Sequence, residues 1–225
     1  MGERIPAWLR PTRGEHRWPA TVSVLVMIGL QVKVLSALHV RPGWVVPAFE
    51  ALLLVVLLIA DPGRLNRETK VLRGLGLGLA FAAAVINAIA AGVLVYDIVS
   101  RHADLGEMTP AELLLTGGAV WLTNVIAFAL LYWELDSGGP AARANARRDR
   151  PDFLFPQMTA PDLARRDWEA GFVDYLYVAF TNATAFSPTD TMPMTQWAKL
   201  TMMFQSVVSV VVVALVIARA INILG

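Results

Sequence analysis

The sequence contains no cysteine, only three histidines and few charged residues. Charged residues make up 16% of the 225 positions, whereas hydrophobic residues make up 56%. The lack of cysteine excludes disulfides, thiol catalysis and cysteine metal sites. His16, His39 and His102 lie far apart in the sequence and predict no metal-ligand cluster. No nucleotide-binding motif or catalytic triad is evident either, so we expect that the protein is not an enzyme and needs no cofactor.

Long apolar runs, separated by short charged stretches, dominate the chain instead. This composition is typical of a membrane protein, and the lipid bilayer is the expected partner. The net charge of +1 gives no basic field that would attract nucleic acid, and no soluble partner is evident. A helix needs about 20 apolar residues to cross the hydrocarbon core. The runs predict an all-α integral membrane protein with about five transmembrane helices and one short re-entrant helix.

The predicted helices divide the chain into three parts. A polar N-terminal tail (1–19) precedes a three-helix membrane region (20–110), whose helices are expected at 20–40, 45–60 and 71–99. The third part (111–225) contains, in order, an outer helix (111–133), a charged linker (134–171), a half-helix (172–186), a loop (187–195) and an inner helix (196–224).

The distribution of Lys and Arg predicts the orientation, because cytoplasmic segments of membrane proteins carry an excess of these residues. The N-terminal tail and the turn between the second and third spans each contain four Lys or Arg, whereas the two turns on the opposite side contain one each. The linker after the fourth span contains six Arg. We therefore expect a protein of the cell (inner) membrane with a cytoplasmic N-terminus and linker, and with the C-terminus outside.

The half-helix is too short to cross the bilayer at 1.5 Å per residue. It can enter the membrane and return only where protein or water surrounds its irregular backbone. Oxygen-bearing side chains gather near its end, at Thr184, Ser187, Thr189 and Asp190. A helix C-terminus carries partial negative charge, which favours cations. The alternative is an interfacial helix that only packs, with Asp190 as a helix N-terminal residue.

This order of elements resembles the pore module of the potassium-channel-like superfamily. The run "LYVAFTNATAF" (176–186), followed by Asp190 and an apolar helix, carries the resemblance. Roughly the last 95 residues also resemble a bacterial family of uncharacterised multi-pass membrane proteins. The matching motifs are Leu131-Tyr132-Trp133, 152–156, 174–181, Thr189-Asp190 and 222–224. The resemblance implies a pore helix, a filter-like loop and an inner helix in each subunit of a homotetramer that conducts cations.

The filter-like loop departs from the potassium-channel pattern T-V-G-Y-G, whose glycines turn successive carbonyls inward. Residues 172–224 contain no glycine, so selectivity would come from side-chain oxygens. We expect a weakly selective pore for monovalent cations, in which Phe186 forms an apolar plug. The filter-like residues are Thr184, Ala185, Phe186, Ser187, Pro188, Thr189 and Asp190.

The Lys and Arg count places this loop on the cytoplasmic side, whereas potassium channels insert theirs from outside. An inverted pore loop, as in glutamate-receptor channels, reconciles the two. Two other functions are compatible with the sequence. One is a non-conducting structural or accessory membrane protein, and the other is a small-solute transporter that uses Lys33 and Glu50.

Several polar residues fall inside the predicted spans, where they usually face protein or water. Lys33 and Glu50 lie at similar depth in adjacent spans, so we expect them to pair. The pair would hold the helical hairpin together or relay ions, unless Lys33 snorkels to the interface. Asn87, Asn124 and Gln205 are expected to form interhelical hydrogen bonds. Gly74 and Gly78 are four residues apart, a spacing that predicts close helix packing.

Overall fold

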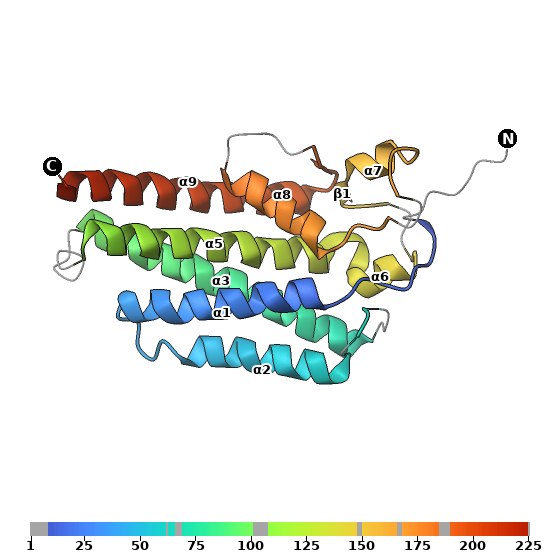
Figure 1. Cartoon of the computed structure of the whole chain (residues 1–225), viewed down its shortest axis with the longest axis horizontal. Helices are drawn as coiled ribbons and strands as arrows, with labels where there is room; N and C mark the ends of the chain where they lie inside the picture. The colour runs from blue at the N-terminus through green and yellow to red at the C-terminus, as the bar shows by residue number, and fades with distance from the viewer. Residues whose placement is uncertain are drawn as a thin grey trace.

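The computed structural model describes residues 9–61, 63–65, 69–100, 108–147, 150–165, 168–184 and 190–224. The long helices lie side by side (Figure 1). They are α1 (Trp18–Ala37), α2 (Val45–Ala60), α3 (Lys70–Ser100), α5 (Pro110–Leu135) and α9 (Gln196–Leu224). The shorter elements are η2 (Asp136–Gly138), α6 (Pro140–Ala144), β1 (Phe153–Leu154), α7 (Pro156–Thr159), α8 (Phe172–Thr184) and β2 (Met192–Pro193).

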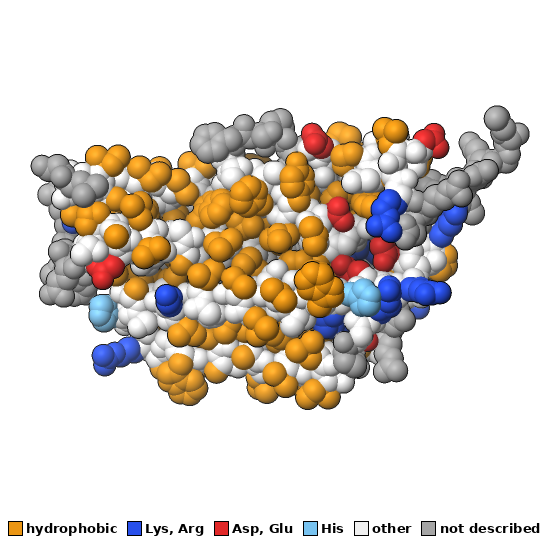
Figure 2. All heavy atoms as spheres, viewed as in Figure 1, with side chains coloured by type: hydrophobic (Ala, Val, Ile, Leu, Met, Phe, Trp, Pro, Cys, Tyr) orange, Lys and Arg blue, Asp and Glu red, His pale blue; other side chains and the backbone are white. Residues whose placement is uncertain are grey.

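Four of these helices, α1, α3, α5 and α9, are long and apolar enough to cross a membrane, whereas α2 is apolar but shorter. Hydrophobic side chains cover the middle of the molecule in Figure 2, and most charged side chains gather at the end that carries the N-terminus. An all-α membrane protein is therefore confirmed. The predicted bounds of α2 and α9 agree with the structure.

Helix α1 ends three residues before its predicted end, and the backbone explains why. His39 adopts a left-handed conformation with φ of 51°. The Val40 N–H donates to the carbonyl of Leu35 (3.0 Å), which closes the last turn in the manner of a Schellman motif. Helix α5 begins at a capping box, in which Thr109 and Glu112 bond each other's backbone N–H groups.

Helix α5 occupies the centre of the bundle. It packs against α1 and α3 on one side and against α8 and α9 on the other, while α2 packs against α1 and α3 at the periphery (Figure 1). The buried core reflects this arrangement, because most side chains in the second half of α5 are inaccessible. By contrast, α9 is the least buried of the four long helices.

Close helix packing occurs at other glycines than the two expected. A Cβ added at Gly74 or Gly78 would meet nothing within 4 Å, so neither glycine supports packing in the structure. A Cβ at Gly76 would instead lie 2.3 Å from Oε1 of Glu134 on α5. At Gly117, a Cβ would lie 2.6 Å from Cγ2 of Val216 on α9. Spacing alone did not reveal which face of α3 points inward.

Gly117→Ala is expected to lower the free energy of unfolding by about 1–3 kcal/mol, because the added methyl overlaps the branched side chain of Val216 on α9. Gly118→Ala provides the matched control. It makes the same change one residue later, in open space, and should be neutral or slightly stabilising. Thermal unfolding of the detergent-solubilised variants measures the difference. Equal stability of the two variants would contradict this packing.

The linker after α5 folds into a cap at the end of the bundle that carries the N-terminus (Figure 1). We use "the cap" for the described residues of 9–17, 136–171 and 190–195. Within it, β1 pairs antiparallel with β2, so that Phe153 faces Pro193 and Leu154 faces Met192. The N-terminal segment is also held, since the Thr12 N–H donates to the Ala144 carbonyl (2.8 Å). The predicted tail and linker are therefore folded over their described residues.

Helix α8 begins in the cap and runs along the bundle. Its direction is parallel to α9 and opposite to α5, since Phe172 contacts Trp133 and Phe180 contacts Trp121. Its described part extends to Thr184, and the last two residues of the predicted half-helix, 185 and 186, lie outside the described residues. Near its end, Asn182 lies beside Ser206, which is about 15 Å along α9 at 1.5 Å per residue. The chain is described again from Asp190, and β2 is back in the cap.

Candidate functional site

The C-terminal half of α8 is fixed to α9 by side-chain hydrogen bonds. Asn182 Nδ2 donates to Gln205 Oε1 (2.7 Å) and to the Met202 carbonyl (2.9 Å). Gln205 is fully buried, and its Nε2 donates to the Ala179 carbonyl (2.9 Å). Ser206 Oγ lies within 3.1 Å of Asn182 Oδ1. These bonds hold the end of α8 at one level of α9.

The same network continues across the bundle into α5 and α3. Tyr132 donates its hydroxyl proton to Gln205 Oε1 (2.7 Å). Asn124 Nδ2 donates to Ser209 Oγ (2.8 Å), and its Oδ1 accepts from Asn87 Nδ2 (2.9 Å). The prediction that Asn87, Asn124 and Gln205 form interhelical hydrogen bonds is confirmed. Tyr132 is a further member of the network that the sequence did not predict.

The predicted filter-like residues fall at the two ends of a stretch that is not described. Thr184 ends α8, and its hydroxyl donates to the Thr181 carbonyl (2.9 Å). Ala185, Phe186, Ser187, Pro188 and Thr189 lie outside the described residues. Asp190 is exposed and lies two residues before β2, hence near the cap. The described ends of this stretch thus lie at different levels, since the end of α8 is beside Ser206 in α9 and Asp190 is near the cap.

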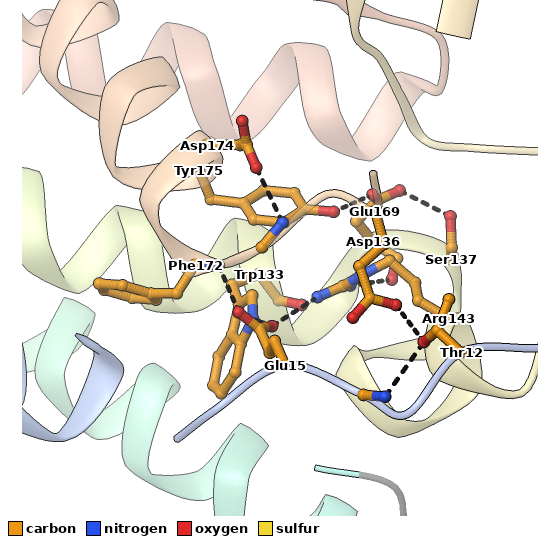
Figure 3. Close-up of polar contacts among 12 residues, drawn as sticks. Thr12, Glu15, Trp133, Asp136, Ser137, Arg143, Glu169, Phe172, Asp174 and Tyr175 are labelled. Carbon is orange, nitrogen blue, oxygen red and sulfur yellow. Dashed lines mark hydrogen bonds and ion pairs between the residues drawn. The ribbon is translucent and has the colours of Figure 1, made fainter. Parts of the chain in front are cut away.

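A second polar cluster, which the sequence did not predict, lies inside the cap (Figure 3). Its centre is Asp136, directly after α5, which is fully buried. Asp136 Oδ1 accepts from the Asp152 N–H (2.8 Å), and Oδ2 accepts from the Tyr175 hydroxyl. Asp152 in turn accepts from the Ser137 N–H (2.9 Å) and from Trp197 Nε1 (3.0 Å). The cluster thereby joins the end of α5 to β1, to the first turn of α8 and to the first turn of α9.

Arg143 and Glu15 connect this cluster to the N-terminal segment. Arg143 Nη1 donates to the carbonyls of Trp133 and Asp136 (2.8 Å each), and its guanidinium lies 4.8 Å from the centre of the Tyr175 ring. Its Nη2 lies 3.9 Å from Glu15 Oε1. Glu15 also accepts from Trp133 Nε1 and from the Phe172 N–H (2.7 Å). Burial raises the pKa of Glu15 above its ordinary value, although Arg143 opposes this.

The predicted pair of Lys33 and Glu50 is not formed. Both residues are described, and neither takes part in the ion pairs found among the described residues. Lys33 is exposed beside a groove between α1 and α5. Glu50 is fully buried, and Gln31 Nε2 donates to its Oε1 (3.3 Å). The two residues agree in depth but not in direction. Positions 31 and 33 lie about 200° apart around a helix, so only Gln31 faces α2.

Lys33→Met is accordingly expected to change the free energy of unfolding by less than about 0.5 kcal/mol. Glu50→Gln should leave stability unchanged or raise it, because it removes a buried carboxylate without a cationic partner and keeps an acceptor for Gln31. The two effects should add in a double-mutant cycle measured by thermal unfolding. If Lys33→Met alone were more damaging than the double change, the two residues would be paired.

No three His, Asp or Glu side chains converge on a possible metal position within the described residues. The candidate positions for a function are the polar contacts of α8 with α9 and the cluster in the cap. Scans against protein-family models, curated proteins and solved structures found no match to this chain.

Proposed function

We propose that the protein is a weakly selective cation pore, built as a homotetramer in which α8 is a re-entrant pore helix. Under this proposal, α5 is the outer helix, α9 is the inner helix, and the loop after Thr184 lines the cation pathway. The four subunits are needed because a single module cannot enclose an axial pore. Selectivity is weak because the loop has no glycine to turn its carbonyls inward.

The course of α8 is the observation that carries this proposal. The helix starts in the cap, at Phe172, and its end lies beside the first third of α9. The chain then returns to the cap, where the Met194 N–H donates to the Asp152 carbonyl (2.8 Å). An interfacial helix would need no such course. Backbone that ends at this depth requires surrounding protein or water, which a pore on a symmetry axis supplies.

The exposed surfaces of α8 and α9 support an assembly of several subunits. Val173, Tyr177 and Phe180 form an exposed stripe along α8 at helical spacing. Helix α9 also exposes large apolar side chains, among them Leu200, Met203, Phe204, Val207 and Val210. Both helices lie on one side of α5, away from α1 and α2 (Figure 1). This side can contact neighbouring subunits without rearrangement of the core.

The proposed orientation places the cap in the cytoplasm. The described parts of the N-terminal segment, of the α2–α3 turn and of the linker meet at one end of the bundle, and Arg64 Nη1 donates to the Gly14 carbonyl (2.8 Å). These are the segments that are rich in Lys and Arg. The pore helix then enters from the cytoplasmic side. The transporter alternative loses its motivation, because Lys33 and Glu50 do not pair.

Native mass spectrometry of the detergent-extracted protein tests the assembly. We expect a species of four chains as the main form. A triple change on the exposed stripe of α8, Val173→Ser with Tyr177→Ser and Phe180→Ser, should dissociate it. The same type of change on the exposed face of α2, at Leu52, Val55 and Ile59, is the matched control. A wild-type protein that is only monomeric at working concentration would remove the pore proposal.

A further inference from the structure

The end of α1 and the start of α5 lie at the end of the bundle opposite the cap (Figure 1). An open groove lies between them, with a volume of about 530 Å³. This size is in the range of pockets that bind small molecules. Both helices are long and apolar enough to cross a membrane, so lipid is the medium that the groove meets.

The charged residues of the groove lie nearer to the helix ends than its deepest apolar residues. Lys33 lies about 6 Å before the last residue of α1, and Glu112 lies about 3 Å after the first residue of α5, at 1.5 Å per residue. Leu30 and Ala119 lie about 10 Å and about 14 Å from the same two ends. The groove is therefore charged near the bilayer surface and apolar further in, which matches an amphiphilic molecule.

Lys33 and Glu112 carry opposite charges on opposite walls of the groove. Within the described chain, Lys33 has neither a hydrogen bond nor an ion pair. Glu112 uses its Oε2 for the backbone N–H and the hydroxyl of Thr109 (2.8 and 2.9 Å), whereas its Oε1 accepts from no described group. Charged side chains in membrane spans usually have a partner. A molecule in the groove can provide one for each charge.

We propose that this groove binds one phospholipid with a phosphoethanolamine headgroup. The phosphate accepts from Lys33, the primary ammonium donates to Oε1 of Glu112, and an acyl chain fills the apolar part of the groove. Ser36 and His39 line the same groove and can provide further donors for the phosphate.

The two charges favour this headgroup over the other common types. A purely anionic headgroup would satisfy Lys33 but would bring negative charge toward Glu112. A choline headgroup has the right charges, but its quaternary nitrogen has no N–H to donate to the carboxylate. A primary ammonium can form a charge-assisted hydrogen bond there.

This inference does not depend on whether the protein conducts ions. The groove is formed by α1 and α5, whereas the proposed contacts between subunits use α8 and α9. The lipid would also provide a partner for Lys33, which does not pair with Glu50.

Native mass spectrometry of the delipidated full chain in detergent tests the proposal. Three phospholipids with identical acyl chains are added separately, and their headgroups are phosphoethanolamine, phosphocholine and phosphoglycerol. We expect the wild type to bind the ethanolamine lipid about fivefold more tightly than either of the others. Lys33→Met should lower this affinity about fivefold. Lys70→Met is the matched control, because it removes an exposed Lys at the start of α3, and it should leave the affinity unchanged.

Glu112→Gln tests the second contact. Gln can replace Glu in a capping box, so α5 keeps its start while the groove loses its negative charge. The preference for the ethanolamine over the glycerol headgroup should disappear in this variant. In lipid-free detergent, the Tm of each variant should match that of the wild type, which separates lipid binding from folding.

The proposal is overturned if the wild type binds the three lipids equally well or binds the glycerol lipid most tightly. It is also overturned if Lys33→Met binds the ethanolamine lipid as the wild type does. Wild-type protein that binds no lipid at all would overturn it as well, because another chain would then cover the groove.

Discussion

Arg143→Met is expected to lower the free energy of unfolding by about 2–4 kcal/mol, because it removes two charge-assisted hydrogen bonds and the cationic partner of a mostly buried carboxylate. Arg143 closes the C-terminus of α5, where its guanidinium donates to two backbone carbonyls. It also lies beside the mostly buried carboxylate of Glu15 and over the ring of Tyr175. Met fills a similar volume but provides no donor, so the two carbonyls lose a hydrogen bond each and Glu15 loses its cationic partner, while Glu15 keeps its bonds from Trp133 and Phe172.

Arg150→Met is the matched control, since Arg150 lies on the same linker but is exposed. Its effect should stay within about 0.5 kcal/mol. Thermal unfolding and limited proteolysis of the cap report the difference. If Arg143→Met unfolded like Arg150→Met, the cap would not hold the ends of α5, α8 and α9 together.

The difference in the free energy of unfolding between Arg143→Met and the wild type should become smaller as the pH falls. Burial already raises the folded-state pKa of Glu15, and Arg143 is the main opposing influence. Without Arg143 that pKa rises further above its unfolded value. A carboxyl group whose pKa is raised in the folded state lowers stability at pH values where it is ionised. This loss of stability disappears as the pH falls through the folded-state pKa, because the carboxyl group then binds a proton. The variant should therefore be closer to the wild type at mildly acidic pH than at alkaline pH.

The sequence was sufficient to predict the five long helices, because the length and hydrophobicity of a span are local properties, but it did not predict α6, α7 and η2 in the linker. The short helix α8 was also predicted, since an apolar run bounded by polar residues can be read without knowing its neighbours. The pairing of Lys33 could not be predicted from local properties. Lys33 and Glu50 lie at similar depth, which suggested a pair, but Gln31 and not Lys33 points toward α2 and bonds Glu50. The inward spacing of Val24, Met27, Gln31 and Val34 is a signal that could have corrected this.

The cap cluster could not be predicted in this way. Asp136 and Tyr175 are 39 residues apart, and Glu15 and Phe172 are 157 apart. Their contacts form only when the linker folds back over the bundle. Neither the composition nor the hydrophobic periodicity of the sequence predicts this folding back. The sequence predicted only a charged linker here, whereas its Asp136 is fully buried and the side chain of Arg143 is only 9% exposed. Buried charges of this kind are recognised only once their partners are known.

The second large effect concerns Asp190, which is exposed at the cap end of the loop after α8. In a tetramer, four such carboxylates near the axis would concentrate cations at the pore mouth. We expect Asp190→Asn to lower cation flux several-fold while leaving the tetramer and its stability unchanged. Asp162→Asn is the control, because Asp162 is equally exposed but lies in the linker after α7. A similar loss in both variants would show that Asp190 has no special position.

Cation flux into liposomes that contain the purified, tetrameric protein tests the central proposal most directly. The account predicts that wild-type protein passes sodium and potassium at comparable rates, since the loop contains no glycine to build a carbonyl filter. It also predicts that Asp190→Asn reduces both rates and Asp162→Asn neither. Absence of flux from correctly assembled wild-type tetramers would contradict the pore proposal and leave α8 with a structural role.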